Sequence, residues 1–250
     1  CDMKKLLVLA FLVLLPLYGW SGTVNEPEVT KIIDDLQEGF AGAISTGVLG
    51  PPRCFGKSGF TLGLLIPCSP LEYTDPDDDK LKEIPIITPS VYARIGLGIC
   101  DIGGKYCYIP EKESVKSASF FGLEVRKRLL KENALKPEVS VSLTYNSLEI
   151  GAGDKDKWKI DWEIKTKGVK LIASKKVFIL SPYVGIGKDW YSAKIKYTIN
   201  ELSISDRSTE RSDSPLRLLV GCELDLLLLK LSAEINKFGN QNIYSVSLRI

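Results

Sequence analysis

The strongest constraint on the fold of this chain is the alternation of apolar and polar residues from Pro215 to Ile250. Apolar residues occupy nearly every second position in the runs 216–224, 229–235 and 244–250. A period of two kept over such lengths predicts β-strands whose two faces meet unlike environments. Alternation alone is symmetric, so it leaves open whether the apolar face points into a soluble core or outward into lipid.

The same pattern recurs upstream and predicts further strands at 60–66, 91–97, 102–108, 121–128, 138–148, 158–173 and 182–187. With the closing runs, this gives about ten strands. Within 158–173 the apolar residues move from even to odd positions at Gly168, which predicts a β-bulge. The polar run at 191–214 fits either a long loop or a hairpin that projects past the main sheet.

The predicted connections alternate in length. Short ones near 98–101, 132–136, 174–176 and 225–227 fall at one end of the strands. Longer ones at 69–87, 110–117, 149–157 and 190–214 fall at the other end, together with a short turn at Gly239 and Asn240. Short periplasmic turns and longer outer loops are typical of outer-membrane barrels, so the short connections are predicted to face the periplasm.

The first residues have the pattern of a secretory signal. Met3 precedes two lysines and the apolar run Leu6–Leu17, and the small residues Gly19 and Ser21 follow. The run is shorter than the roughly 20 residues that a spanning helix needs. We therefore expect residues 1–21 to be a signal peptide with upstream residues, and the mature chain to begin near Gly22.

One amphipathic helix is predicted at 28–44, because Val29, Ile32, Ile33, Leu36 and Phe40 fall on one helical face. Its apolar face must rest on another surface, either the open end of the barrel or a membrane. We therefore assign 22–56 to this helix and a linker, as a periplasmic lid or a plug, and 57–250 to the barrel.

Composition excludes several classes of protein. Lys and Arg number 33 against 31 Asp and Glu, so the net charge of +2 gives no general case for binding nucleic acid. Charged residues make up 26% of the chain, which excludes a bundle of membrane helices. The cysteines match no zinc spacing, and we assign no disulfide pairing. The acidic run at 75–79 lacks the glycine and the twelfth ligand of a calcium loop, so no metal or cofactor is expected.

Three features favour an apolar face that points into lipid. The opposite face is polar and charged, as a filled lumen requires, and no charge interrupts the apolar residues of 139–145 or 158–164. Aromatic residues lie mainly toward strand ends, as membrane girdles do: Tyr92, Tyr106, Tyr108, Tyr145, Trp158, Trp162, Trp190 and Tyr244. The even strand count fits a closed barrel. The lumen-lining candidates are Arg94, Lys105, Glu124, Arg126, Arg128, Arg217, Glu223, Lys230, Glu234 and Arg249.

The sequence thus predicts an all-β fold, an antiparallel up-and-down transmembrane barrel of about ten strands with a short N-terminal helix. The stretches 92–98, 181–187, 221–234 and 244–248 resemble a family of uncharacterised single-barrel proteins of the bacterial outer membrane. The resemblance covers most of residues 57–250. It implies residence in the outer membrane of a Gram-negative-type bacterium, with lipid and the barrel-assembly machinery as partners. Ile250 stands where the usual insertion signal has an aromatic residue.

The chain contains no histidine, the residue that most often does general acid–base work near neutral pH. Lys230 and Ser232 share one strand face, but such pairs are far more often lumen lining than catalytic groups. We therefore expect no enzyme. Two functions stay open: a narrow channel or transporter for small or apolar solutes, or a structural or adhesive scaffold with a filled lumen and partner-binding outer loops.

Overall fold

The computed structural model describes residues 26–47, 50–51, 54–55, 57–74, 81–110, 115–154, 158–199 and 204–250. One helix, α3 (Glu26–Ser45), precedes the strands and confirms the predicted helix. The strands are β1 (Lys57–Thr74), β2 (Leu81–Ile87), β3 (Ser90–Leu97), β4 (Asp101–Ile109), β5 (Val115–Leu130), β6 (Glu138–Asp154), β7 (Trp158–Ser174), β8 (Leu180–Ile199), β9 (Ile204–Asp213), β10 (Leu216–Leu226), β11 (Leu229–Phe238) and β12 (Gln241–Arg249).

These segments form one antiparallel sheet that closes on itself, because β1 pairs with β12. Two pairs of segments each act as a single barrel strand. β2 and β3 pair with successive parts of β1, and β9 and β10 pair with successive parts of β8. The result is a closed ten-stranded barrel, as the sequence predicts.

A proline interrupts each of the two composite strands. Pro89 lies between β2 and β3, and Pro215 lies between β9 and β10. Proline has no backbone N–H and cannot donate to the ladder, so pairing stops there and resumes beyond it. Neighbouring backbone groups still bridge both gaps: the Thr88 N–H donates to the Pro67 carbonyl at 3.2 Å, and the Asp189 N–H donates to the Pro215 carbonyl at 3.1 Å. The wall of the barrel therefore continues across both prolines.

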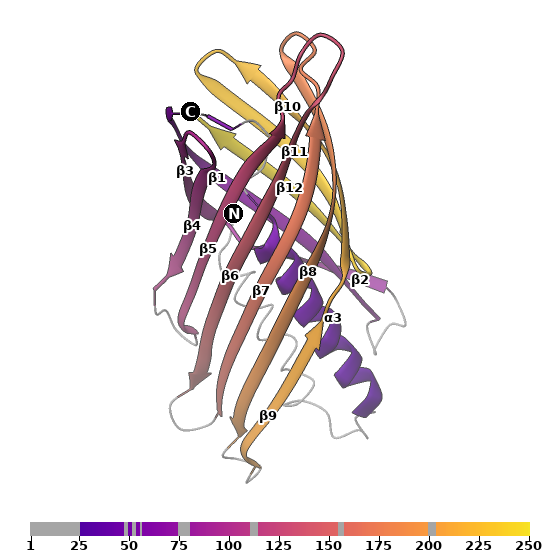
Figure 1. Ribbon diagram of the computed structural model, residues 1–250. Coiled ribbons are helices and arrows are strands. Elements are labelled where there is room, and N and C mark those ends of the chain that lie inside the picture. Colours follow the sequence, from indigo (N-terminus) through magenta and orange to yellow (C-terminus); the bar gives the residue numbers. More distant parts are fainter. Residues whose placement is uncertain are drawn as a thin grey trace.

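The two ends of the barrel differ (Figure 1). At the end called here the short-turn end, strands are joined near 98–100, 131–137, 175–179 and 227–228. At the opposite, long-strand end, β6, β7, β8 and β9 extend well past the other strands. The polar run at 191–214 is therefore a hairpin of β8 and β9. The predicted long loops at 69–87 and 149–157 are largely strand, and residues 75–80, with the acidic run, lie outside the described residues.

A continuous apolar band covers the outside of the barrel. Outward side chains along β1, β3, β10 and β12 are mainly apolar, and Phe60, Leu64, Ile95, Leu218 and Leu248 are 43–62% exposed. Inward positions on the same strands carry buried polar groups such as Thr61, Arg94 and Ser247. A closed barrel with an apolar exterior and a polar interior is the structure that crosses a bilayer with strands. The predicted face assignment thus holds for these strands.

The predicted bulge at Gly168 is wrong. β7 keeps an unbroken register with β6 and with β8 through Gly168. The even residues of β7 face inward along the strand, from Trp162 and Ile164 to Lys170 and Ile172. Apolar residues change phase because the strand leaves the membrane: beyond Gly168 toward the long-strand end, charged residues face water and apolar residues face inward.

This change of environment also corrects part of the predicted aromatic girdle. Tyr106, Tyr108, Trp190 and Tyr244 are exposed on the outer face, at 45–55%. Tyr92 is instead 1% exposed inside the barrel, and Trp162 packs inward against Phe40 of α3. The side chain of Trp158 lies outside the described residues. Within the described part of the chain, no helix combines the length and the hydropathy that a membrane crossing requires.

Candidate functional site

The interior of the barrel holds the helix. α3 lies inside the wall, beside β1, β6, β7, β8 and β12 (Figure 1). Its last residues Ala41, Ala43, Ile44 and Ser45 are completely buried. The sequence leaves a lid or a plug open for this helix, and in the structure its C-terminal half lies within the lumen. The candidate functional site is this filled lumen, which has three regions.

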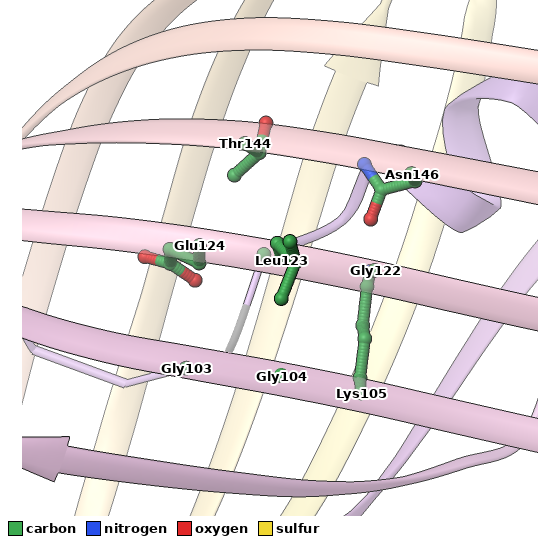
Figure 2. Close-up of a pocket in the computed structure, with 9 residues that line it drawn as sticks. Gly103, Gly104, Lys105, Gly122, Leu123, Glu124, Thr144 and Asn146 are labelled. Atoms are coloured by element: carbon green, nitrogen blue, oxygen red, sulfur yellow. The ribbon is translucent and has the colours of Figure 1, made fainter.

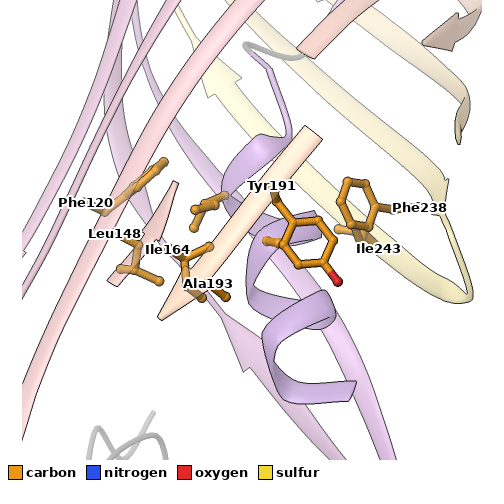
Figure 3. Close-up of a cluster of buried hydrophobic side chains, with 9 residues drawn as sticks. Phe120, Leu148, Ile164, Tyr191, Ala193, Phe238 and Ile243 are labelled. Atoms are coloured by element: carbon orange, nitrogen blue, oxygen red, sulfur yellow. The ribbon is translucent and has the colours of Figure 1, made fainter. Parts of the chain in front are cut away.

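The first region is an apolar cluster in the long-strand half (Figure 3). Ala41 and Ile44 of α3 pack among buried wall residues: Phe120, Leu148, Ile164, Tyr191, Ala193, Phe238 and Ile243. Phe40 meets Trp162 edge to face, with ring centroids 4.9 Å apart. Burial of apolar surface is the main favourable term in packing, so this cluster holds the amphipathic face of the helix in place.

Polar contacts also join the same helix to the barrel wall. The Glu38 carboxylate accepts a hydrogen bond from the Asn240 N–H, at 2.8 Å, in the turn between β11 and β12. Arg211 of β9 lies 3.3 Å from Asp34. The helix is thereby attached both to the closing hairpin of the barrel and to the hairpin that projects past the membrane.

The second region surrounds the C-terminal end of α3. Lys105 donates to the carbonyls of Ile44, at 2.7 Å, and of Thr46. Lys170 donates to the Ser45 carbonyl at 2.7 Å, and Arg217 donates to the Gly42 carbonyl at 3.3 Å and to the Ser45 hydroxyl. The last carbonyls of a helix lack partners within it and carry partial negative charge. The last turn of α3 has no basic residue of its own, so the wall supplies the cations.

The third region is the short-turn half, where described parts of the segment after the helix meet charged wall residues. Arg126 donates to the Pro51 carbonyl at 3.2 Å, and Arg128 donates to the Cys54 carbonyl. The Phe55 N–H donates to both carboxylate oxygens of Asp101, at 3.1 and 3.2 Å. The Arg94 guanidinium lies over the Phe55 ring, 4.6 Å from its centroid. Backbone of this segment thus replaces water as the partner of the lumen charges.

Ion pairs between strands, and one within β5, balance charges on the inner wall. Arg217 and Asp189 are 2.7 Å apart, and Arg126 and Glu124 are also 2.7 Å apart, in both cases fully or almost fully buried. Arg249 pairs with Glu223, and Arg128 lies 2.7 Å from Glu138 with 32% of its side chain exposed. Removing a charge from water is costly unless it is paired and hydrogen-bonded, and these groups meet both conditions.

The ten residues proposed from the sequence as lumen lining lie as follows. Arg94, Lys105, Glu124, Arg126, Arg217, Glu223, Glu234 and Arg249 are buried, at 7% exposure or less. Arg128 and Lys230 share the inward phase of β5 and β11 but lie nearer the short-turn mouth and are half-buried. Lys105 and Arg217 meet at the helix end with Lys170, whereas Arg94, Arg126 and Arg128 contact the segment after the helix.

Sequence reasoning missed four members of this network. Lys170, Asp189 and Glu138 are buried on the inner face, and Asp101 was assigned to a turn although it begins β4. Alternation could have found two of them: Asp189 continues the phase of Tyr183, Gly185 and Gly187, and Lys170 alternates with the apolar run at 169–173. The partners of each group depend on strand register, which no local pattern gives.

A small cavity remains beside this network (Figure 2). It has a volume of about 10 Å³ and is lined by residues of β4, β5 and β6 with Gly47, including Lys105, Glu124 and Asn146. That volume suits about one water molecule. Within the described residues, no group of three or more Cys, Asp or Glu side chains is placed to hold a metal ion, and no disulfide joins Cys54, Cys68, Cys100, Cys107 or Cys222 to another of these cysteines.

Comparisons with solved structures return other barrels. The chain is similar to the attachment invasion locus protein Ail of Yersinia pestis, at 12% identity over 78% of this chain and 99% of Ail, with a TM-score of 0.37. It is similar to the translocator domain of the autotransporter NalP from Neisseria meningitidis, at 11% identity over 88% and 95% of the two chains, with a TM-score of 0.46. It is also similar to the outer membrane protease OmpT of Escherichia coli, at 7% identity over 82% and 97%, with a TM-score of 0.45.

No curated protein sequence matches the chain. A family profile does match it, over residues 84–250, which span the barrel from the end of β2 through β12. The chain therefore belongs to the family of unknown function DUF6588.

Proposed function

We propose that the protein is a non-enzymatic barrel of the outer membrane of a Gram-negative-type bacterium, and that it acts as a closed scaffold that displays the β6–β9 wall outside the cell. The observation that carries the proposal is the filled lumen: α3 occupies it, and Lys105, Lys170 and Arg217 hold the helix end. We infer that a barrel whose lumen is filled in this way does not conduct ions.

The placement follows from the two unlike ends. Short turns at one end and long strands at the other are the pattern of barrels inserted from the periplasm. The short-turn end is therefore assigned to the periplasm and the projecting wall to the outside. Charged residues such as Lys159, Glu163 and Lys194 cover the outer side of that wall, which suits contact with water-soluble partners.

Conduction is the second candidate, and the polar short-turn half favours it. Charged side chains and a backbone segment fill that half, and water could replace them if the helix left. A ten-stranded barrel is narrow, so such a conduit would pass small solutes only. The absence of histidine from the sequence supports a non-enzymatic role for either candidate.

Planar-bilayer conductance of the refolded protein separates the two. The full chain is expected to show no conductance, and a variant lacking residues 26–45 is the matched test of the lumen. Both samples must first show the heat-dependent gel mobility of a folded barrel. Steady conductance from the full chain would contradict the scaffold proposal. The absence of conductance from both folded proteins would contradict the conduit proposal.

A further inference from the structure

A cluster of unpaired lysines marks the boundary of the apolar band on one side of the barrel. On β7 the outward residues Ala173, Leu171 and Val169 are followed by Lys167, and on β8 Pro182, Val184 and Ile186 are followed by Lys188. Each lysine is thus the first charged outward residue as its strand leaves the band. Both side chains are exposed.

Aromatic residues flank these lysines. Lys167 is paired in register with Tyr145 of β6 and Trp190 of β8, and Trp190 is 45% exposed. Lys188 is paired with Val169 and Leu216. The two lysines are diagonal neighbours across β7 and β8, a relation that places residues about 7–8 Å apart. Tyrosine and tryptophan at the edge of an apolar band lie at the level of lipid headgroups.

Lysines beyond this boundary pair with a carboxylate or stand opposite one in register, and these two do not. Lys159 lies 2.5 Å from Asp161, Lys165 pairs with Glu163, and Lys194 stands between Glu163 and Glu210 in register. Among the described residues, neither Lys167 nor Lys188 has a carboxylate opposite it or forms an ion pair. Two unpaired cations are therefore held together at the depth where the phosphates of a bilayer lie.

We propose that Tyr145, Lys167, Lys188 and Trp190, the boundary patch, bind the phosphate groups of lipids in the leaflet at the long-strand end. The lysine ammonium groups are donors and point charges for phosphate oxygens, and the rings occupy the interface beside them. The inference goes beyond the proposed function, because it needs only a barrel that crosses a membrane and holds equally for a scaffold and a conduit.

The test uses the refolded full chain in detergent with phosphatidic acid or phosphatidylcholine of the same acyl chains, and native mass spectrometry counts the lipids retained. The wild type is expected to retain phosphatidic acid in preference to phosphatidylcholine. The variant Lys167→Gln/Lys188→Gln should lose that preference by about tenfold or more, and Lys167→Arg/Lys188→Arg should keep it. The matched control Lys159→Gln/Lys194→Gln removes the same charge from paired positions and should retain the lipid.

Equal losses in the boundary-patch and control variants would show attraction by net charge and overturn the proposal. So would equal retention of the two lipids by the wild type. A third arm adds inorganic phosphate. Displacement of the lipid by an equimolar amount of free phosphate would identify a site for the free anion and not for a lipid. All of these side chains are on the outer surface, so the variants are expected to fold, and gel mobility checks that they do.

Discussion

At the scale of single residues, the energetic cost of introducing a charge depends on whether the side chain points into lipid, into water or into the lumen. Leu143 of β6 is 57% exposed within the apolar band, so Leu143→Arg would place a cation in lipid. We expect a loss of about 2–4 kcal/mol in the free energy of unfolding, measured by urea titration of the barrel in lipid vesicles. Ser147→Arg, on the same face but nearer the long-strand end, is the matched control and should cost much less.

The neighbouring Ser142 faces the lumen, and a polar lumen by itself would suggest that an arginine is tolerated there better than at Leu143. Ser142 is 1% exposed and stands between Arg126 and Lys170 in register. A third cation there would be buried without a partner.

If Leu143→Arg and Ser147→Arg lower the free energy of unfolding by the same amount, the assignment of the outer face to lipid is wrong.

Burial also sets how much each lumen ion pair contributes to the free energy of unfolding. Arg217 and Asp189 are both 0% exposed, so Arg217→Gln would leave a buried carboxylate without its cation and is expected to cost about 3–5 kcal/mol in urea titration. Arg128→Gln breaks the pair with Glu138 at a position where the Arg128 side chain is 32% exposed, so water can partly replace the cation, and the loss should be smaller than for Arg217→Gln. A small loss for Arg217→Gln would mean that water enters the lumen and solvates Asp189.

At the scale of elements, helix α3 is held by shape as well as by charge. A Cβ at Gly42 would lie 2.5 Å from Cδ1 of Ile243 and 3.0 Å from the Phe238 ring. Gly42→Ala raises intrinsic helix propensity by about 1 kcal/mol, but overpacking of a filled core costs about 1–3 kcal/mol. Both neighbouring side chains are fully buried, so neither has free space to move into. We therefore expect the cost of overpacking to exceed the gain in helix propensity.

Hydrogen exchange of the helix amides measures the outcome. Gly42→Ala is expected to speed exchange in 34–45, although the substitution favours an isolated helix. Gly104→Ala serves as control, because its Cβ would face lipid with its nearest neighbour 3.7 Å away. Slower exchange in Gly42→Ala would show that propensity and not packing governs the helix, and the plug would then fit loosely.

At the scale of the whole molecule, the barrel has two environments stacked along its axis. Across the membrane, apolar residues face outward, and paired charges with a backbone segment fill the interior. Past the membrane, β7 reverses this pattern: Lys165 and Glu163 face water, and Ile164 and Trp162 face inward against the helix. The helix joins the two, with its apolar side in the apolar cluster of the long-strand half and its C-terminal carbonyls on the lumen cations.

The sequence by itself determined what depends on local periodicity: the strands, their number, the helix, and the alternation of short and long connections. The outward direction of the apolar face was inferred from the charges on the opposite face and from the aromatic residues, because alternation alone is symmetric. It could not separate a bulge at Gly168 from a strand that leaves the membrane, because both shift an apolar pattern by one residue. Only the tertiary structure decided that α3 lies in the lumen, that Arg217 meets Asp189, and that Trp162 faces the helix. The physical reason is register: the partners of inward side chains are set by hydrogen bonding between strands far apart in the chain, and closure through β1 and β12 fixes them all together.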